Sequence, residues 1–254
     1  GLDWNDVHQI QGLDAVRGAF TINRYRAPIS EWLFSTCKFM GEAPEREWLV
    51  ENTFPQGAVT ILAAAGDAGK GMLTMDLALK VGRPPTGGML DARFAFGNKV
   101  ARHGTVVILS AEDDENEVHR RVRGLGGQLT DKVAVIPLPN AGGPLPLIKD
   151  TPDGPQVTTE WREIREQLLM IKDLALVVID PLASFVMADV NSDPAVGAFT
   201  MGVFAALATE TGAAVVVCHH MTKTGGSDIK NPEQARALVR GSTALVDGSR
   251  AVYV

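Results

Sequence analysis

A glycine-rich turn between an apolar run and an apolar-periodic stretch is the feature that most constrains the fold of this chain. The turn follows the apolar run 58–62, precedes the stretch 72–81, and reads Gly66-Asp67-Ala68-Gly69-Lys70-Gly71. A strand that ends in such a turn and opens a helix aims several backbone N–H groups at one point, where the positive end of the helix favours an anion. The sequence therefore predicts a loop that binds nucleotide phosphates, built by the residues from Ala65 to Met72.

The match of this turn to the phosphate-loop pattern G-x-x-x-x-G-K-S/T is incomplete. Lys70 would place a positive charge beside the terminal phosphates, but Ala64 stands at the first glycine position and Gly71 at the hydroxyl position. Gly71 has no oxygen to offer the Mg²⁺ that normally bridges two phosphates, so we expect metal ligands to come from elsewhere. The alternative interpretation is a helix-capping turn with a chance lysine, and the strand and helix around the turn make it the weaker one.

Composition limits the classes of protein to which the chain can belong. Its 254 residues, 45% of them hydrophobic, suffice for one α/β core with an appendage. No apolar run reaches the ~18 residues of a membrane span. No signal-peptide pattern is present either, so we expect a cytoplasmic protein without a membrane partner. Cys37 and Cys218 lack the spacing of a zinc site, in line with a reducing compartment. The formal net charge of -6 argues that any contact with nucleic acid is local.

Strand-like runs alternate with helix-period stretches through most of the chain. The runs lie at 58–65, 105–109, 133–136, 174–179 and 213–218, and the helical stretches at 70–81, 115–122, 160–171 and 195–211. Such crossovers join parallel strands, so we predict an α/β fold, a mostly parallel twisted sheet with helices on both faces. The long segments 84–103 and 137–159 are expected to be surface or subunit-contact loops. The chain stops within 250–254, which reads as a strand without a following turn and favours a fragment.

Two acidic residues follow predicted strands, where ligands bind in open parallel sheets. Asp180 ends the run 174–179 and is the predicted ligand of Mg²⁺, directly or through water. Its alternative role is a helix-capping aspartate before Pro181. Glu112 follows the run 106–109 and is predicted to orient and deprotonate water. For Glu112 the alternative is that the acidic residues 112–115 only favour the start of the next helix.

A third strand end carries two histidines, His219 and His220. One imidazole could sense the γ-phosphate and relay its loss to the following segment, although a structural pair is the alternative. A zinc site is disfavoured because adjacent residues of a strand point opposite ways.

The segment after the histidines is basic. A mobile cationic loop can track a phosphate backbone without reading bases, whereas a solvated surface loop is an equally good account. Arg240 or Arg250 could also serve as an arginine finger in a neighbouring subunit's site. The cations of this segment are Lys223, Lys230, Arg236 and Arg240.

These motifs together resemble the RepA-like hexameric replicative helicases, a RecA-fold ATPase family. The resemblance covers about 46–254 and rests on the ordered segments 47–50, 64–71, 109–113, 178–182, 219–223 and 240–245. It implies a RecA-like P-loop NTPase fold that binds ATP and Mg²⁺. In residue terms it implies Lys70 on the phosphates, Glu112 as catalytic base, Asp180 at Mg²⁺, His220 as γ-phosphate sensor and Arg240 as the finger acting in trans. Gly71 departs from the Ser/Thr usual there, which puts metal coordination in doubt.

The resemblance also implies a domain division and a function. Residues 44–254 would be the ATPase core, truncated at its C-terminus, and residues 1–43 an appendage and linker that weakly resembles the end of a Toprim primase domain. We expect the motor core of a ring-shaped, homo-hexameric DNA helicase of phage or plasmid type that translocates on single-stranded DNA beside a linked or separate primase. The alternatives are a recombinase-like DNA-binding ATPase and a nucleotide-binding assembly module with little turnover.

Overall fold

The computed structural model describes most of the chain from residue 39 onward. The described ranges are 39–66, 68–84, 94–126, 129–190, 193–221, 231, 233–234, 238–239 and 243–254. By its internal contacts the chain divides into two units, Gly1–Glu45 and Arg46–Val254, and the helices and strands named below belong to the second. Several predicted residues lie outside the described ranges, so their roles stay predictions: Asp67, Lys223, Lys230, Arg236 and Arg240, together with nearly all of the N-terminal appendage.

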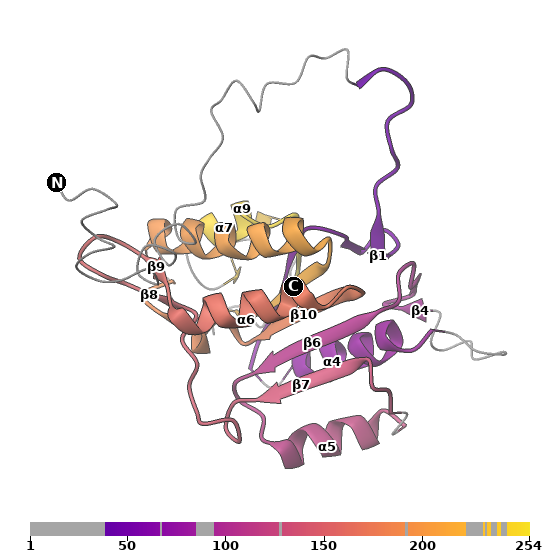
Figure 1. The fold of residues 1–254 in the computed structure, drawn as a ribbon, viewed down its shortest axis with the longest axis horizontal. Coiled ribbons are helices and arrows are strands. Elements are labelled where there is room, and N and C mark those ends of the chain that lie inside the picture. The colour runs from indigo at the N-terminus through magenta and orange to yellow at the C-terminus, as the bar shows by residue number, and fades with distance from the viewer. Residues whose placement is uncertain are drawn as a thin grey trace, which may run out of the picture. The chain divides into compact units, whose positions relative to one another are not determined.

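A parallel sheet of six strands forms the centre of the second unit (Figure 1). Its strands, in spatial order, are β13 (Ala251–Tyr253), β3 (Val59–Ala64), β12 (Ala214–His220), β10 (Leu174–Asp180), β6 (Thr105–Ser110) and β7 (Val133–Pro137). The predicted strands are confirmed, with one difference at β12. This strand continues through both histidines, because they pair with Ala63 and Ala64 of β3.

Helices connect these strands as crossovers. They are α4 (Lys70–Gly82) after β3, α5 (Glu115–Gly124) after β6, α6 (Thr159–Met170) before β10, α7 (Pro194–Thr211) before β12 and the short α9 (Thr243–Asp247) before β13. Local signals fix their ends: the Thr158 and Asp193 side chains accept hydrogen bonds from the first turns of α6 and α7, and α7 ends at Gly212 with φ 67°. The four helices expected from periodicity are therefore confirmed to within two residues at each end.

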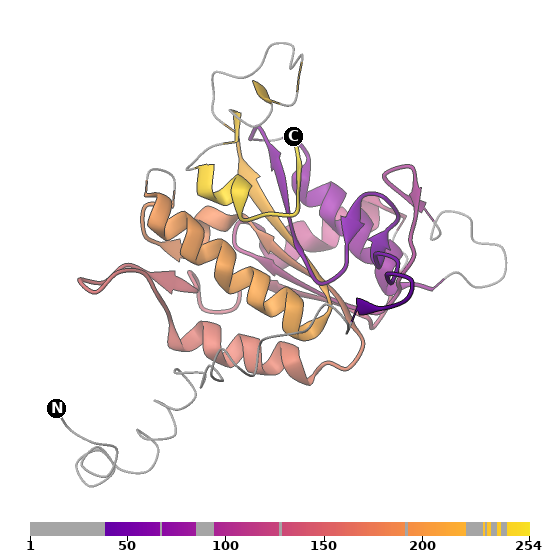
Figure 2. The same ribbon diagram turned by 90° about the horizontal axis from the view of Figure 1, so that it is seen from above.

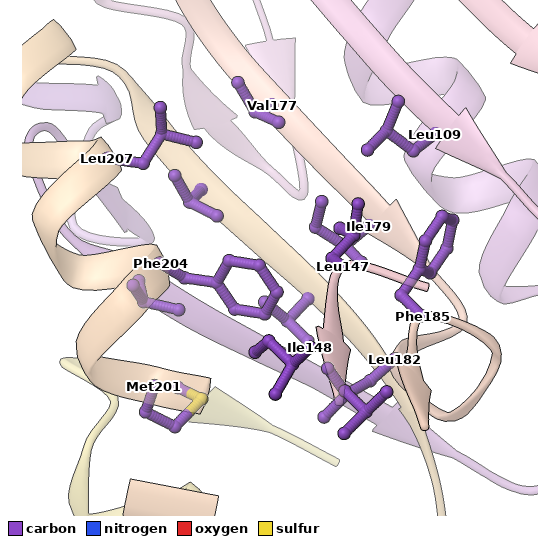
Figure 3. Packing of buried hydrophobic residues seen from close by; sticks show 14 of the residues in the cluster. Leu109, Leu147, Ile148, Val177, Ile179, Leu182, Phe185, Met201, Phe204 and Leu207 are labelled. Atoms are coloured by element: carbon purple, nitrogen blue, oxygen red, sulfur yellow. The ribbon is translucent and has the colours of Figure 1, made fainter. Parts of the chain in front are cut away.

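Alternate residues of each strand pack into different cores, one on each face of the sheet. In β10, Val177 and Ile179 pack with α6 and α7, whereas Leu176 and Val178 pack with α4. Figure 3 shows part of the first cluster, with Phe204 pointing from α7 into it. Figures 1 and 2 show helices on both sides of the sheet, and the predicted α/β architecture of a parallel sheet covered by helices on both faces is confirmed.

The segment expected to be a long surface loop at 137–159 is instead partly core. It contains β8 (Ile148–Lys149) and β9 (Gln156–Val157), which form a three-stranded sheet with β11 (Val186–Met187). Leu147 and Ile148 are fully buried and belong to the same core cluster as Phe185. The expectation of a surface loop is therefore wrong here, because two apolar side chains fold the segment back onto the core.

Two antiparallel strand pairs complete the second unit. They are β1 (Trp48–Val50) with β2 (Phe54–Pro55), and β4 (Phe94–Ala95) with β5 (Asn98–Lys99). A bridge between Val50 and Val100 ties the two pairs together. Within the described ranges, no helix combines the length and the apolar character that crossing a membrane requires.

Candidate nucleotide-binding site

The glycine-rich turn joins the carboxyl end of β3 to the start of α4. Gly69 is the residue before the helix and has φ 85°, a left-handed conformation that glycine adopts without a Cβ penalty. No side chain caps this helix and its first turn holds no acidic residue. Since the first N–H groups of a helix lack partners within it, this end suits an anion such as a phosphate.

Lys70 is held over the turn by neutral hydrogen-bond acceptors. Its Nζ atom donates to the backbone oxygens of Ala64 at 3.2 Å and Ala65 at 3.0 Å. The residue is buried and lines the same cavity as the turn. The acceptors of these two bonds are uncharged, so the bonds do not pair the ammonium with a carboxylate and leave it available to an anionic ligand.

A cavity of about 450 Å³ lies at the carboxyl ends of β3, β6, β10 and β12. Four residues predicted from separate motifs, Lys70, Glu112, Asp180 and His220, line it together. The other lining residues are Gly66, Ala68, Gly69, Gly71, Met72, Ser110, Asp113, Glu117 and Arg121. The structure therefore brings together predicted residues that are far apart in the sequence, since Lys70 and His220 are 150 positions apart. Ala65 is not part of the lining and contributes through its bond to Lys70.

Asp180 is the last residue of β10 and is partly shielded from solvent. Burial raises the pKa of this carboxyl, and the nearby charges of Asp113 and Glu112 raise it further. A hydrogen bond from the Cys218 thiol and the charge of Lys70 act in the opposite direction. The helix-capping alternative for Asp180 is wrong, because the following 3-10 turn (Leu182–Ser184) begins after Pro181 and has no side-chain cap.

Glu112 and His220 face each other at the mouth of the cavity. The Oε1 atom of Glu112 lies 3.8 Å from Nε2 of His220, and the Glu112 side chain is 63% exposed. Asp114 caps α5 instead, since its Oδ1 atom accepts from the Glu117 N–H at 2.7 Å. Asp114, and not Glu112, is therefore the acidic residue whose side chain caps the start of α5. His219 is buried while its neighbour lines the cavity, as strand geometry predicts.

An ion pair that the sequence analysis missed lies beside the phosphate loop. Arg121 of α5 contacts both carboxylate oxygens of Asp113, Nη1 at 2.6 Å and Nη2 at 2.7 Å, and its Nε donates to Glu117 at 3.3 Å. Burial raises the pKa of Asp113, and the Arg121 charge together with a Ser110 hydrogen bond offsets only part of this rise. The spacing of Glu117 and Arg121 on a predicted helix was a visible signal, but nothing in the sequence placed that helix face against Gly71.

The groups beside the loop do not fit the usual Mg²⁺ arrangement. A Cβ atom added at Gly71 would lie 1.7 Å from Nη1 of Arg121, so a guanidinium fills the space of the missing hydroxyl side chain. The nearest hydroxyl along the helix, that of Thr74, donates to the backbone oxygens of Lys70 and Gly71. The described part of the chain holds no group of three or more His, Cys, Asp or Glu residues suited to a metal. Metal binding by Asp180 therefore stays a prediction.

The two arginines considered as fingers differ in what the structure says of them. Arg240 lies outside the described residues. Arg250 is exposed and immediately precedes β13, and its backbone N–H donates to the oxygen of Val59 at 2.8 Å. Val59 begins β3, so Arg250 lies at the end of the sheet opposite the phosphate loop of its own subunit.

Comparisons with known proteins give a structural similarity and a family. The crystal structure of the RadB recombinase is similar to this chain with a TM-score of 0.45 and 14% sequence identity, over 78% of this chain and 74% of that one. A family model described as an AAA domain matches residues 24–226, which is more than half of the chain. The chain therefore belongs to the AAA domain family of nucleotide-binding P-loop ATPases.

Proposed function

We propose that the chain is the ATP-dependent motor core of a ring-shaped replicative DNA helicase, which couples ATP hydrolysis to translocation on single-stranded DNA. The observation that carries this proposal is the cavity at the carboxyl ends of the strands, which Lys70, Glu112, Asp180 and His220 line together. A cation beside an anion site and a solvent-accessible carboxylate that can orient water are groups used in phosphoryl transfer to water, and His220 lines the same cavity.

The chain's own residues support hydrolysis in the following way. The N-terminus of α4 and the Lys70 ammonium hold the phosphates and stabilise the charge that develops on the transferred group. Glu112 orients a water molecule and takes its proton. The water oxygen forms a bond to the γ-phosphorus while the bond from that phosphorus to the bridging oxygen breaks and ADP leaves. The partly exposed position of Glu112 gives water access to it.

His220 connects this chemistry to the basic segment that follows it. The residue ends β12, and the next residue, Met221, forms an antiparallel bridge with Val239. The segment between these two residues therefore begins and ends next to the site, and its sequence contains the cations Lys223, Lys230 and Arg236. Loss of the γ-phosphate would change the partner of His220 and thereby the position of this segment. In a chain of net charge -6, such a segment is a suitable local contact for a DNA backbone.

The decisive measurement is the ATPase rate with and without single-stranded DNA. The proposal predicts a rate that DNA stimulates severalfold and that Lys70→Ala abolishes in both conditions. A strand-displacement assay on a forked duplex then separates a helicase from a recombinase-like ATPase, which would bind and be stimulated by DNA without unwinding. An ATPase rate that does not change when DNA is added contradicts both the helicase and the recombinase-like ATPase.

A nucleotide-dependent assembly module is a second candidate, favoured by the missing hydroxyl at Gly71. The two functions respond differently to Glu112→Gln. A motor retains ATP binding and loses turnover by about 10²-fold or more, as removal of a general base does. A module with little turnover is unaffected. Glu115→Gln is the matched control, because Glu115 is exposed on α5 and does not line the cavity.

A further inference from the structure

We propose that Arg121 is a phosphate-binding residue that replaces both the hydroxyl of the loop and the metal it would hold, so that this site binds a nucleoside triphosphate without Mg²⁺. The inference rests on the proposed nucleotide binding and adds to it a residue and a cation requirement. It comes from the meeting of two features, a glycine where a hydroxyl is expected and an arginine from another helix in the space that the glycine leaves.

The guanidinium occupies that space closely. Measured from the Cβ position that a side chain at residue 71 would have, Nη1 of Arg121 lies at 1.7 Å, Cζ at 2.9 Å and Nη2 at 3.6 Å. No residue other than glycine leaves room for this arrangement at position 71. The Arg121 guanidinium therefore stands beside the first turn of α4, at the place of the hydroxyl that would hold the metal, and shares its charge with the carboxylates of Asp113 and Glu117.

The hydrogen bonds of Arg121 hold it in place and leave donors for a ligand. A guanidinium has five N–H groups. The structure gives one bond from Nη1 and one from Nη2 to Asp113, and one from Nε to Glu117. Each Nη atom thus keeps a second N–H, and Arg121 lines the cavity that the loop faces. These two N–H groups point to opposite sides of the guanidinium, so Arg121 can give a phosphate oxygen one charge-assisted hydrogen bond from one of its Nη atoms.

Asp113 and Glu117 act as positioning residues for the guanidinium. The Asp113 side chain is 16% exposed and that of Arg121 is 23% exposed, so the pair is shielded from solvent on most sides. Such a bidentate contact fixes the plane of the guanidinium before any ligand arrives, which lowers the entropy lost on binding. A metal ion placed at the same point would meet this positive charge.

The test is binding of a fluorescent ATP analogue, measured in a buffer with Mg²⁺ and in one with EDTA. We expect the wild-type affinity in EDTA to lie within about threefold of that in Mg²⁺, since Arg121 supplies the second charge-assisted contact to the phosphates beside Lys70. Arg121→Gln should weaken binding in EDTA by about tenfold or more, the size of effect expected for a lost charge-assisted hydrogen bond. Arg121→Lys, which keeps the charge, should recover part of this loss.

Arg120→Gln is the matched control variant. Arg120 precedes Arg121 on α5, pairs with Glu117 at 2.8 Å and has a 67% exposed side chain that does not line the cavity. The Arg120→Gln substitution removes the same charge from the same helix as Arg121→Gln does. It should change the affinity for the ATP analogue by less than about twofold, as expected of a screened surface charge. Thermal unfolding of each variant verifies that the fold is kept.

The Mg²⁺ dependence of nucleotide binding by a double variant distinguishes a phosphate-binding Arg121 from an Arg121 that only stabilises the fold through its ion pair. Arg121→Gln combined with Gly71→Ser removes the cation and restores the hydroxyl, so nucleotide binding should become dependent on Mg²⁺. Wild-type binding that needs Mg²⁺, or Arg121→Gln binding as tightly as wild type in EDTA, overturns the inference and leaves the proposed function intact. Wild-type protein that binds no nucleotide in either buffer overturns the proposed function itself.

Discussion

Gly71→Ala is the substitution whose effect on stability the structure predicts most specifically. The new Cβ would lie 1.7 Å from Nη1 of Arg121, whereas ordinary contact begins at 3.4 Å. The clash is with the end of a side chain, so the guanidinium rather than the backbone has to move. That movement separates Arg121 from Asp113, whose two contacts with it are at 2.6 Å and 2.7 Å.

Two effects of opposite sign decide how much Gly71→Ala changes the free energy of unfolding. Residue 71 lies in the first turn of α4, and in a helix alanine is more favourable than glycine by up to ~1 kcal/mol. Loss of hydrogen bonds to a charged group costs ~1.5–3 kcal/mol, and the low exposure of both partners places this pair within that range rather than near zero. The second effect is larger, so Gly71→Ala should destabilise the protein by about 1–2 kcal/mol net.

Urea unfolding of four proteins measures this prediction. They are the wild type, Gly71→Ala, Arg121→Ala and the double variant. Without the arginine the clash disappears, and Gly71→Ala should then stabilise by about 0.5–1 kcal/mol. The sign of the effect therefore reverses between the two backgrounds. Gly66→Ala is the control, since its Cβ would meet nothing within 4 Å. If Gly71→Ala stabilises the wild type as much as the Arg121→Ala protein, the reasoning is refuted.

Three other predictions test the site and the core. In the folded state burial chiefly raises the pKa of the Asp180 carboxyl above its ordinary value of 3.8, so the folded state binds this proton more tightly than the unfolded state does. Stability therefore falls as pH rises from 3.8 through the raised pKa of the folded state. Asp180→Asn should therefore raise Tm at pH 7, and a gain that does not shrink as pH falls toward 3.8 would contradict this assignment. His220→Asn should keep nucleotide affinity but lose DNA stimulation of the ATPase, and retained stimulation would exclude the relay. Phe204→Ala, which removes a fully buried ring 5.6 Å from that of Trp161, should cost about 3–5 kcal/mol in urea unfolding, well above the half-buried Phe199→Ala.

The strands and helices could be predicted from the sequence because each one is a local pattern. The run Leu174–Asp180 is apolar up to its last residue because both faces of β10 are covered, and such runs are legible without knowing their partners. The rule that ligands bind at the carboxyl ends of parallel strands then brought Glu112, Asp180 and His220 to one place. The same local reasoning failed at Leu147 and Ile148, whose burial depends on contacts with Phe185 across the fold.

The pairing of Gly71 with Arg121 shows where prediction from sequence stopped and why. In the sequence, Gly71 is the loss of a metal ligand, and Arg121 is one of several cations on a polar helix. They are 50 positions apart and no local rule links them. In the fold, α5 follows β6 and packs near α4, so the arginine reaches the gap that the glycine leaves. In the proposed phosphate-binding role of Arg121, the missing oxygen and the added cation belong together, because a covalently attached side chain then stands where an exchangeable metal would. A site built in this way should respond to Arg121 substitution as an ordinary phosphate loop responds to removal of Mg²⁺.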